Sequence, residues 1–191
     1  MPDENSPSSN LNLPNQITIA RLVISVLLFV FMSLHQFVPS LICFVLAAGT
    51  DWVDGYIARK YDLVTQLGRI LDPFADKILI CGIFVFLAAE PGSEIVAWMS
   101  VVIVGRELLV TALRSFLEQQ GGDFSAKMAG KLKMVFQCAA VILSLLLLIQ
   151  GDPVNDGLRY ATIATVWLAV ASTVYSGLGY VLSAGRMLRH A

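Results

Sequence analysis

Four aspartates stand in two closely spaced pairs between Asp51 and Asp76. Asp51 and Asp54 are three residues apart and Asp72 and Asp76 are four apart, so in helices each pair shares one face. Four carboxylates without matched cations repel one another, and a divalent metal is the natural counter-charge. Carboxylate oxygens favour Mg²⁺, Mn²⁺ or Ca²⁺ over zinc or copper. The pairs therefore predict a metal centre suited to phosphate-ester chemistry, where two metals stabilise the charge of displacement.

The segments that position these pairs belong to a strongly apolar chain. Hydrophobic residues make up 57% and charged residues 14% of its 191 residues, whereas soluble domains carry about 25% charged residues. Its long apolar runs predict an all-α membrane protein with six transmembrane helices. We expect one domain, residues 13–191, after a disordered cytoplasmic tail, residues 1–12. The expected spans are Ile17–Leu34, Val38–Ala58, Ile70–Ala89, Ile95–Leu117, Ala129–Ile149 and Leu158–Leu182.

Lysine and arginine are unevenly distributed between the connections. On the side of the loops after the first, third and fifth spans, Arg159 at the start of the sixth span is the only Lys or Arg, whereas the other connections and the C-terminus are rich in these residues. Because such residues concentrate on the cytoplasmic side, both termini and the aspartates are expected to face the cytoplasm, in a multi-pass inner-membrane protein. Pro14 and Asn15 open the first span and predict a short N-terminal interfacial segment.

Three alternatives to a catalytic metal centre account for the aspartates less well. Helix capping or a place in an interfacial loop accounts for a lone acidic residue such as Asp62, but leaves the cost of charge in the spans unexplained. A carrier of divalent cations or protons predicts acidic residues spread over several helices and accessible from both faces. The four aspartates instead lie in two adjacent segments. A structural or partner-binding protein leaves their fixed spacing unexplained, so an enzyme is favoured.

The segment also resembles the signature of the CDP-alcohol phosphotransferase family. It reads D-x-x-D-G-x-x-A-R, then eight residues, then G-x-x-x-D-x-x-x-D. The matching positions are Asp51, Asp54, Gly55, Ala58, Arg59, Gly68, Asp72 and Asp76. The resemblance implies transfer of a phosphatidyl group from CDP-diacylglycerol to an alcohol, with CMP as the leaving group. It also implies a homodimer.

The resemblance further implies a role for each residue of the motif. Asp51, Asp54 and Asp72 would ligate a two-metal centre of Mg²⁺ or Mn²⁺. Asp76 would lie at the same metals and act catalytically as general base on the attacking hydroxyl. The residues implied to bind CDP-diacylglycerol are Asp54, Gly55, Ala58, Arg59, Thr65 and Gly68.

Cations on or beside the fourth and fifth spans indicate what kind of acceptor the enzyme would use. Arg106 enters an apolar stretch, where it needs a partner, either the neighbouring Glu107 or an anionic ligand. An acceptor with its own phosphate would account for such cations, although ordinary loop charge is the alternative for Arg114. The predicted acceptor-phosphate residues are Arg106, Arg114, Lys131 and Lys133.

Three flanking segments resemble one branch of the family more than others. LPNQITIARL, GRELLVTALR and AGKLKM are similar to phosphatidylglycerophosphate synthases, which implies sn-glycerol 3-phosphate as the acceptor. Phosphatidylinositol phosphate synthases resemble the chain at the motif and at Gly130-Lys131, so inositol phosphate is the alternative. Cardiolipin and phosphatidylserine synthases rank behind these two.

Overall fold

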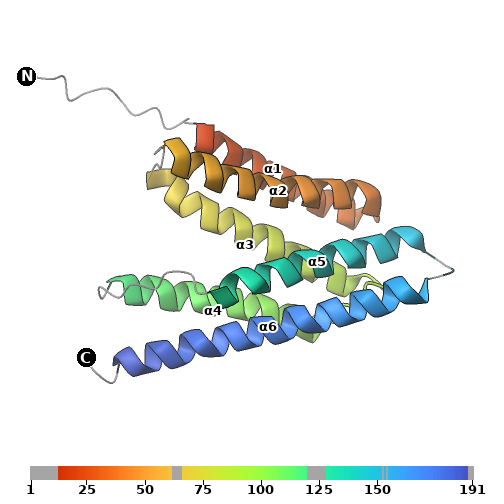
Figure 1. Ribbon diagram of the computed structural model, residues 1–191. Coiled ribbons are helices and arrows are strands. Elements are labelled where there is room, and N and C mark those ends of the chain that lie inside the picture. Colours follow the sequence, from red (N-terminus) through yellow and green to blue (C-terminus); the bar gives the residue numbers. More distant parts are fainter. Residues whose placement is uncertain (1–12, 62–65, 120–127, 152, 154, 189–191) are drawn as a thin grey trace, which may run out of the picture.

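Six α-helices make up the part of the chain that the computed structural model describes, which is residues 13–61, 66–119, 128–151, 153 and 155–188 (Figure 1). Side chains are described for residues 16–50, 73–115, 132–151, 153, 155–182 and 185. No strand occurs in these ranges, so the predicted all-α architecture is confirmed. The helices are α1 Leu13–Ser33, α2 Phe37–Tyr61, α3 Gln66–Ala89, α4 Ala97–Gln119, α5 Met128–Gln150 and α6 Asp156–Leu188.

Several helices extend beyond the predicted spans. The second continues to Tyr61, the third begins at Gln66, and the sixth reaches Leu188. The predicted spans were drawn from hydropathy, whereas backbone hydrogen bonding continues through polar residues at a helix end. The two aspartate pairs lie within regular helix, as the predicted spans had placed them.

The apolar character needed to cross a membrane is unevenly shared among the helices. Within the described residues, three helical stretches are long and apolar enough to span, namely Gln16–Ser33, Leu132–Gln150 and Asp156–Leu182. The apolar part of α2 is shorter, Phe37–Thr50, because charged residues follow it. These helices identify a membrane protein.

The helix order leaves the predicted cytoplasmic elements together at one end (Figure 1). One end of each helix lies on the left in that view. These ends are the starts of α1, α3 and α5 and the ends of α2, α4 and α6. α1 packs against α2 and α3, and α6 packs against α5 and α4. α5 also contacts α2 and α3, and therefore joins the two groups of helices.

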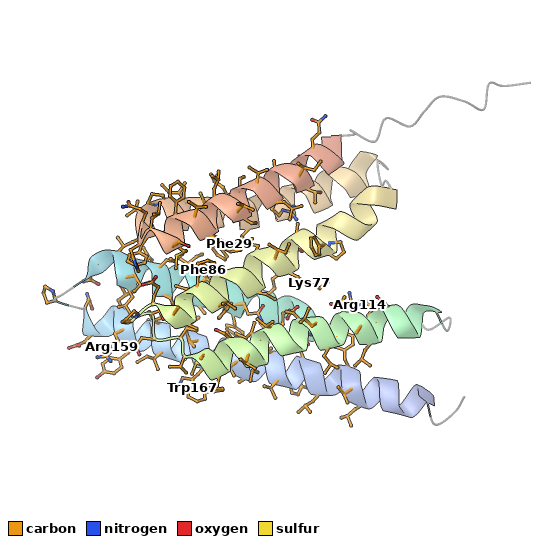
Figure 2. All side chains as sticks on the ribbon, turned by 180° about the vertical axis from the view of Figure 1, so that it is seen from behind. Phe29, Lys77, Phe86, Arg114, Arg159 and Trp167 are labelled. Atoms are coloured by element: carbon orange, nitrogen blue, oxygen red, sulfur yellow. The ribbon has the colours of Figure 1, made fainter. Side chains whose placement is uncertain are left out.

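Apolar side chains fill the spaces between the helices, and aromatic pairs join helices distant in sequence (Figure 2). Phe29 of α1 stacks on Phe86 of α3 with ring centroids 5.3 Å apart, and Trp98 of α4 meets Trp167 of α6 at 5.7 Å. The Phe29 ring packs directly against Gly82 of α3. A Cβ at that position would clash with the ring, since it would lie 2.2 Å from Phe29 Cζ. This packing sets how α3 lies beside α1.

Candidate active site

The four predicted metal ligands lie on consecutive helices at the end of the molecule where α2 ends and α3 begins (Figure 1). Asp51 and Asp54 occupy the last turns of α2, and Asp72 and Asp76 the first turns of α3. Because the backbone is helical through both pairs, each pair lies on one helix face. α2 and α3 also contact each other.

Of these four aspartates, Asp76 has a side chain within the described set, and it forms a part-buried ion pair. Arg21 of α1 donates a hydrogen bond from Nη1 to Asp76 Oδ1 over 3.1 Å. The Arg21 side chain is 1% exposed and that of Asp76 is 33% exposed. Sequence reasoning did not assign Arg21, although a cation inside the apolar first helix was a signal that an acidic partner was needed.

The donor set fits a divalent metal by its chemistry. All four candidates are carboxylates, and Mg²⁺ and Mn²⁺ prefer oxygen ligands. Among the described side chains, no three His, Cys, Asp or Glu residues form a group that could hold a metal ion. Three of the four aspartates fall outside that set, so the metal centre stays a prediction supported by residue type and helix position.

The residues predicted to bind CDP-diacylglycerol follow the same two helices. Gly55, Ala58 and Arg59 continue α2 after Asp54, and Gly68 lies in the first turn of α3. Thr65 lies outside the described residues. The structure thus places the backbone of all but Thr65, and the nucleotide contacts remain predictions.

Two predicted acceptor-binding cations from different helices meet at a single carboxylate. Glu107 of α4 accepts a hydrogen bond at Oε1 from Arg106 Nη1 over 3.1 Å, and the same oxygen accepts one from Lys133 Nζ of α5. These three side chains are nearly buried, with 9% to 12% exposed. Glu107 is therefore a partner of Arg106, which is one of the two predicted possibilities. Lys131 also lies on α5, but its side chain is outside the described set.

Helix α6 supplies further partners that sequence reasoning missed. Arg106 donates from Nη2 to Ser176 Oγ over 2.7 Å, and Arg114 donates from Nη2 to the Tyr180 hydroxyl over 2.9 Å. Ser176 and Tyr180 are four residues apart, and so face α4 together. A single Ser or Tyr in an apolar helix gives no sign that it accepts a hydrogen bond from an arginine, so the sequence did not predict these two partners.

The cation cluster, defined as Arg106, Glu107, Arg114 and Lys133, combines three cations with one carboxylate and so carries an excess of two positive charges. The Nε atoms of Arg106 and Arg114 are buried without a hydrogen-bond partner among the described residues. Buried donors are usually satisfied, so an anionic ligand is a candidate partner for these two atoms.

The cation cluster also faces the helix that carries Asp76. Both helices that supply the cluster, α4 and α5, contact α3, which carries Asp76. The two candidate sites therefore lie on helices that pack against one another.

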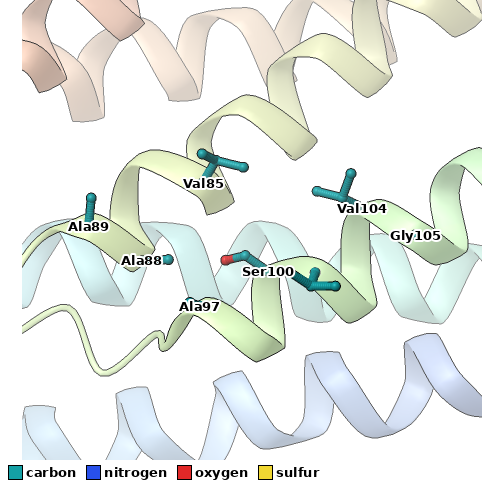
Figure 3. A pocket seen from close by; sticks show the side chains of 8 residues that line it. Val85, Ala88, Ala89, Ala97, Ser100, Val104 and Gly105 are labelled. Carbon is teal, nitrogen blue, oxygen red and sulfur yellow. The ribbon is translucent and has the colours of Figure 1, made fainter.

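Two apolar grooves lie along α3 and α4. One, of about 490 Å³, is lined by small and branched side chains that include Ala88, Ser100 and Val104 (Figure 3). The other, of about 430 Å³, includes Phe74, Lys77 and Cys81. Neither is lined by the carboxylates or the cation cluster, so the grooves are not the polar site itself.

Comparison with known proteins agrees with the resemblance seen in the motif. Residues 11–175 match the family model described as CDP-alcohol phosphatidyltransferase. Three relatives carry the name CDP-diacylglycerol--glycerol-3-phosphate 3-phosphatidyltransferase. That of Bacillus subtilis (strain 168) is 38% identical over 185 residues, covering 88% of this chain and 93% of the relative. That of Rickettsia felis is 39% identical over 176 residues, with 88% and 93% covered, and that of Pseudomonas fluorescens is 32% identical over 181 residues, with 91% and 90% covered. With a family match over most of its length and a helical membrane fold, the chain belongs to the CDP-alcohol phosphatidyltransferase family and is an enzyme of that class.

Proposed function

We propose that the enzyme transfers the phosphatidyl group of CDP-diacylglycerol to sn-glycerol 3-phosphate, giving phosphatidylglycerophosphate and CMP. The observation that carries this proposal is the part-buried cation cluster beside α3, with its excess of two positive charges. A phosphate monoester carries roughly 1.5 to 2 negative charges at neutral pH, which matches that excess. The names of the relatives point to the same acceptor.

The proposed chemistry is one displacement at phosphorus. The acceptor hydroxyl forms a new oxygen–phosphorus bond to the phosphatidyl group, the bond from that phosphorus to CMP breaks, and CMP leaves with the bonding electrons. Asp76 accepts the proton of the attacking hydroxyl as the bond forms. Arg21 holds the Asp76 carboxylate through its 3.1 Å hydrogen bond, and thereby orients the base.

The metals and the donor are assigned to the α2–α3 region. Members of the family generally depend on a divalent metal. Asp51, Asp54, Asp72 and Asp76 would hold two ions of Mg²⁺ or Mn²⁺, which would bind the pyrophosphate and neutralise its developing charge. The proposed nucleotide and pyrophosphate contacts come from Asp54, Gly55, Ala58, Arg59, Thr65 and Gly68.

The acceptor is assigned to the cation cluster, with Lys131 as a further contact. Arg106 and Arg114 can each offer planar guanidinium donors to phosphate oxygens, and Lys133 adds a point charge. An enzyme placed in the inner membrane with both termini in the cytoplasm would meet this water-soluble acceptor on the side where the helix ends gather (Figure 1). A homodimer is part of the proposal because the family resemblance implies it.

Inositol phosphate is the second candidate acceptor, because its phosphate satisfies the same charge requirement. The relatives' names favour glycerol 3-phosphate over it. Serine carries no phosphate, so serine as the acceptor would not account for the positive charges of the cation cluster.

The test uses the purified protein with CDP-diacylglycerol, Mg²⁺ or Mn²⁺, and each acceptor in turn. We expect CMP release that depends on glycerol 3-phosphate and on the metal, and little release with inositol phosphate. Release driven by inositol phosphate alone would overturn the acceptor assignment. No release with any acceptor, together with metal-ion flux through liposomes containing the protein, would overturn the enzymatic proposal.

A further inference from the structure

We infer that Tyr180 and Ser176 of α6 form a positioning platform that holds the guanidinium groups of Arg106 and Arg114 in the orientation that binds the acceptor phosphate. This inference rests on the proposed function, since it concerns the same acceptor site. It assigns a role in acceptor affinity to α6, which carries none of the motif residues.

Tyr180 touches both arginines. Its ring centroid lies 5.7 Å from Arg106 Cζ and 5.6 Å from Arg114 Cζ, within the range of cation–π attraction. Its hydroxyl also accepts the hydrogen bond from Arg114 Nη2. The side chain is only 7% exposed, so these interactions are little weakened by water.

One ring therefore links two cations that are well separated along α4. Arg106 and Arg114 are eight residues apart, a rise of about 12 Å. Both carry long side chains that lose considerable rotamer freedom when they are held still. An aromatic face against both guanidinium groups offsets their mutual repulsion and restricts their orientations before the acceptor arrives, which lowers the entropy lost on binding.

The neighbouring turn of α6 completes the hold on Arg106. Ser176 Oγ accepts from Nη2 and Glu107 Oε1 accepts from Nη1, so both terminal nitrogens of Arg106 are engaged. Gly177 leaves room for the side-chain stem, since a Cβ there would lie 3.1 Å from Arg106 Cγ. The Nε atoms of Arg106 and Arg114 keep no partner among the described residues, and a phosphate oxygen could accept from them.

A purely structural role would make different kinetic predictions. If Tyr180 only packed α6 against α4, its loss would destabilise the whole enzyme and affect the use of both substrates alike. A positioning role affects the Michaelis constant of the phosphorylated acceptor, while that of CDP-diacylglycerol and the turnover at saturating acceptor change little.

The experiment measures CMP release by purified Tyr180→Phe, Tyr180→Leu and Ser176→Ala variants. Each substrate is varied while the other is saturating, and binding of sn-glycerol 3-phosphate is followed separately by calorimetry. Tyr180→Phe keeps the ring and removes the hydroxyl, so we expect the acceptor KM to rise roughly 3- to 10-fold, the size of one hydrogen bond. Tyr180→Leu removes both interactions, and we expect a rise of roughly 10- to 100-fold. Ser176→Ala should resemble Tyr180→Phe.

Tyr175 provides the matched control, because it lies on the same helix and is 75% exposed. Tyr175→Phe and Tyr175→Leu should leave both KM values unchanged. An unchanged acceptor KM in Tyr180→Leu would overturn the platform, as would equal rises for both substrates in the well-folded Tyr180→Phe.

The positioning platform and the acceptor assignment can fail independently of each other. If inositol phosphate drives the wild-type enzyme instead of glycerol 3-phosphate, the proposed acceptor fails, and the platform is judged by the same titration with inositol phosphate. A wild-type enzyme that turns over without any phosphorylated acceptor would overturn both.

Discussion

Replacing Arg21 with methionine tests the connection between α1 and the proposed base. Methionine keeps much of the length of the buried side chain but cannot donate to Asp76 Oδ1. A hydrogen bond to a charged group contributes about 1.5 to 3 kcal/mol. Because the Asp76 side chain is 33% exposed, water screens part of this loss, and we take the lower end, about 1.5 to 2 kcal/mol.

If that loss appears in the transition state, where Asp76 must be oriented toward the acceptor hydroxyl, kcat should fall roughly 10- to 30-fold. The assay is CMP release with both substrates varied, together with thermal unfolding of each purified variant. Both KM values should stay close to wild type, and Arg21→Lys should recover part of the lost kcat because it restores a charged donor.

Arg159 offers the matched control for this prediction. It forms an ion pair with Glu94 at 2.7 Å, at the opposite end of the helices, and its side chain is 53% exposed. Arg159→Met should leave kcat unchanged, since an exposed pair contributes little. The proposed role of Arg21 would be refuted if Arg21→Met kept the wild-type kcat, or if Arg159→Met lost as much.

Three further substitutions, one of them with a matched control, test other parts of the structure. Asp76→Asn should abolish CMP release while metal or CDP-diacylglycerol binding is partly retained, and near-normal turnover would show that Asp76 is not the base. Lys133→Met should raise the KM of glycerol 3-phosphate roughly 10-fold or more through loss of a charge-assisted contact, with the CDP-diacylglycerol KM unchanged. An equal rise for both substrates would argue against an acceptor site there. Gly82→Ala places a Cβ against the Phe29 ring, so we expect a loss of about 1 to 3 kcal/mol in thermal unfolding experiments. Gly49→Ala meets nothing within 4 Å and should be neutral or slightly stabilising, so equal effects of the two glycine substitutions would contradict the packing argument.

The helices could be predicted because their signal is local. An apolar run long enough to cross a membrane, broken by glycine and proline, identifies a helix without knowledge of its neighbours. The helix ends were less predictable, and α6 reaches Leu188 rather than Leu182, since hydropathy does not mark where backbone hydrogen bonding stops. The placement of Asp51 and Asp54 on one helix and Asp72 and Asp76 on the next likewise followed from spacing alone.

The candidate site likewise has residues that the sequence predicted and partners that it did not. Residue type and spacing pointed to Asp76 and Arg106, because charge in an apolar helix needs a reason. Their partners were not predictable: Arg21 is 55 residues from Asp76, and Ser176 is 70 residues from Arg106. Such contacts depend on how each helix is rotated about its axis and on its depth against its neighbours.

The sequence by itself determined six helices, two carboxylate pairs and the family to which the enzyme belongs. Each of these depends on residues close together in the chain. The tertiary structure decided that α1 supplies a buried cation to Asp76, and that α6 supplies Tyr180 beneath Arg106 and Arg114. Contacts of this kind are set by packing such as that of Phe29 against Gly82, which fixes how two helices lie together and so which distant side chains can meet.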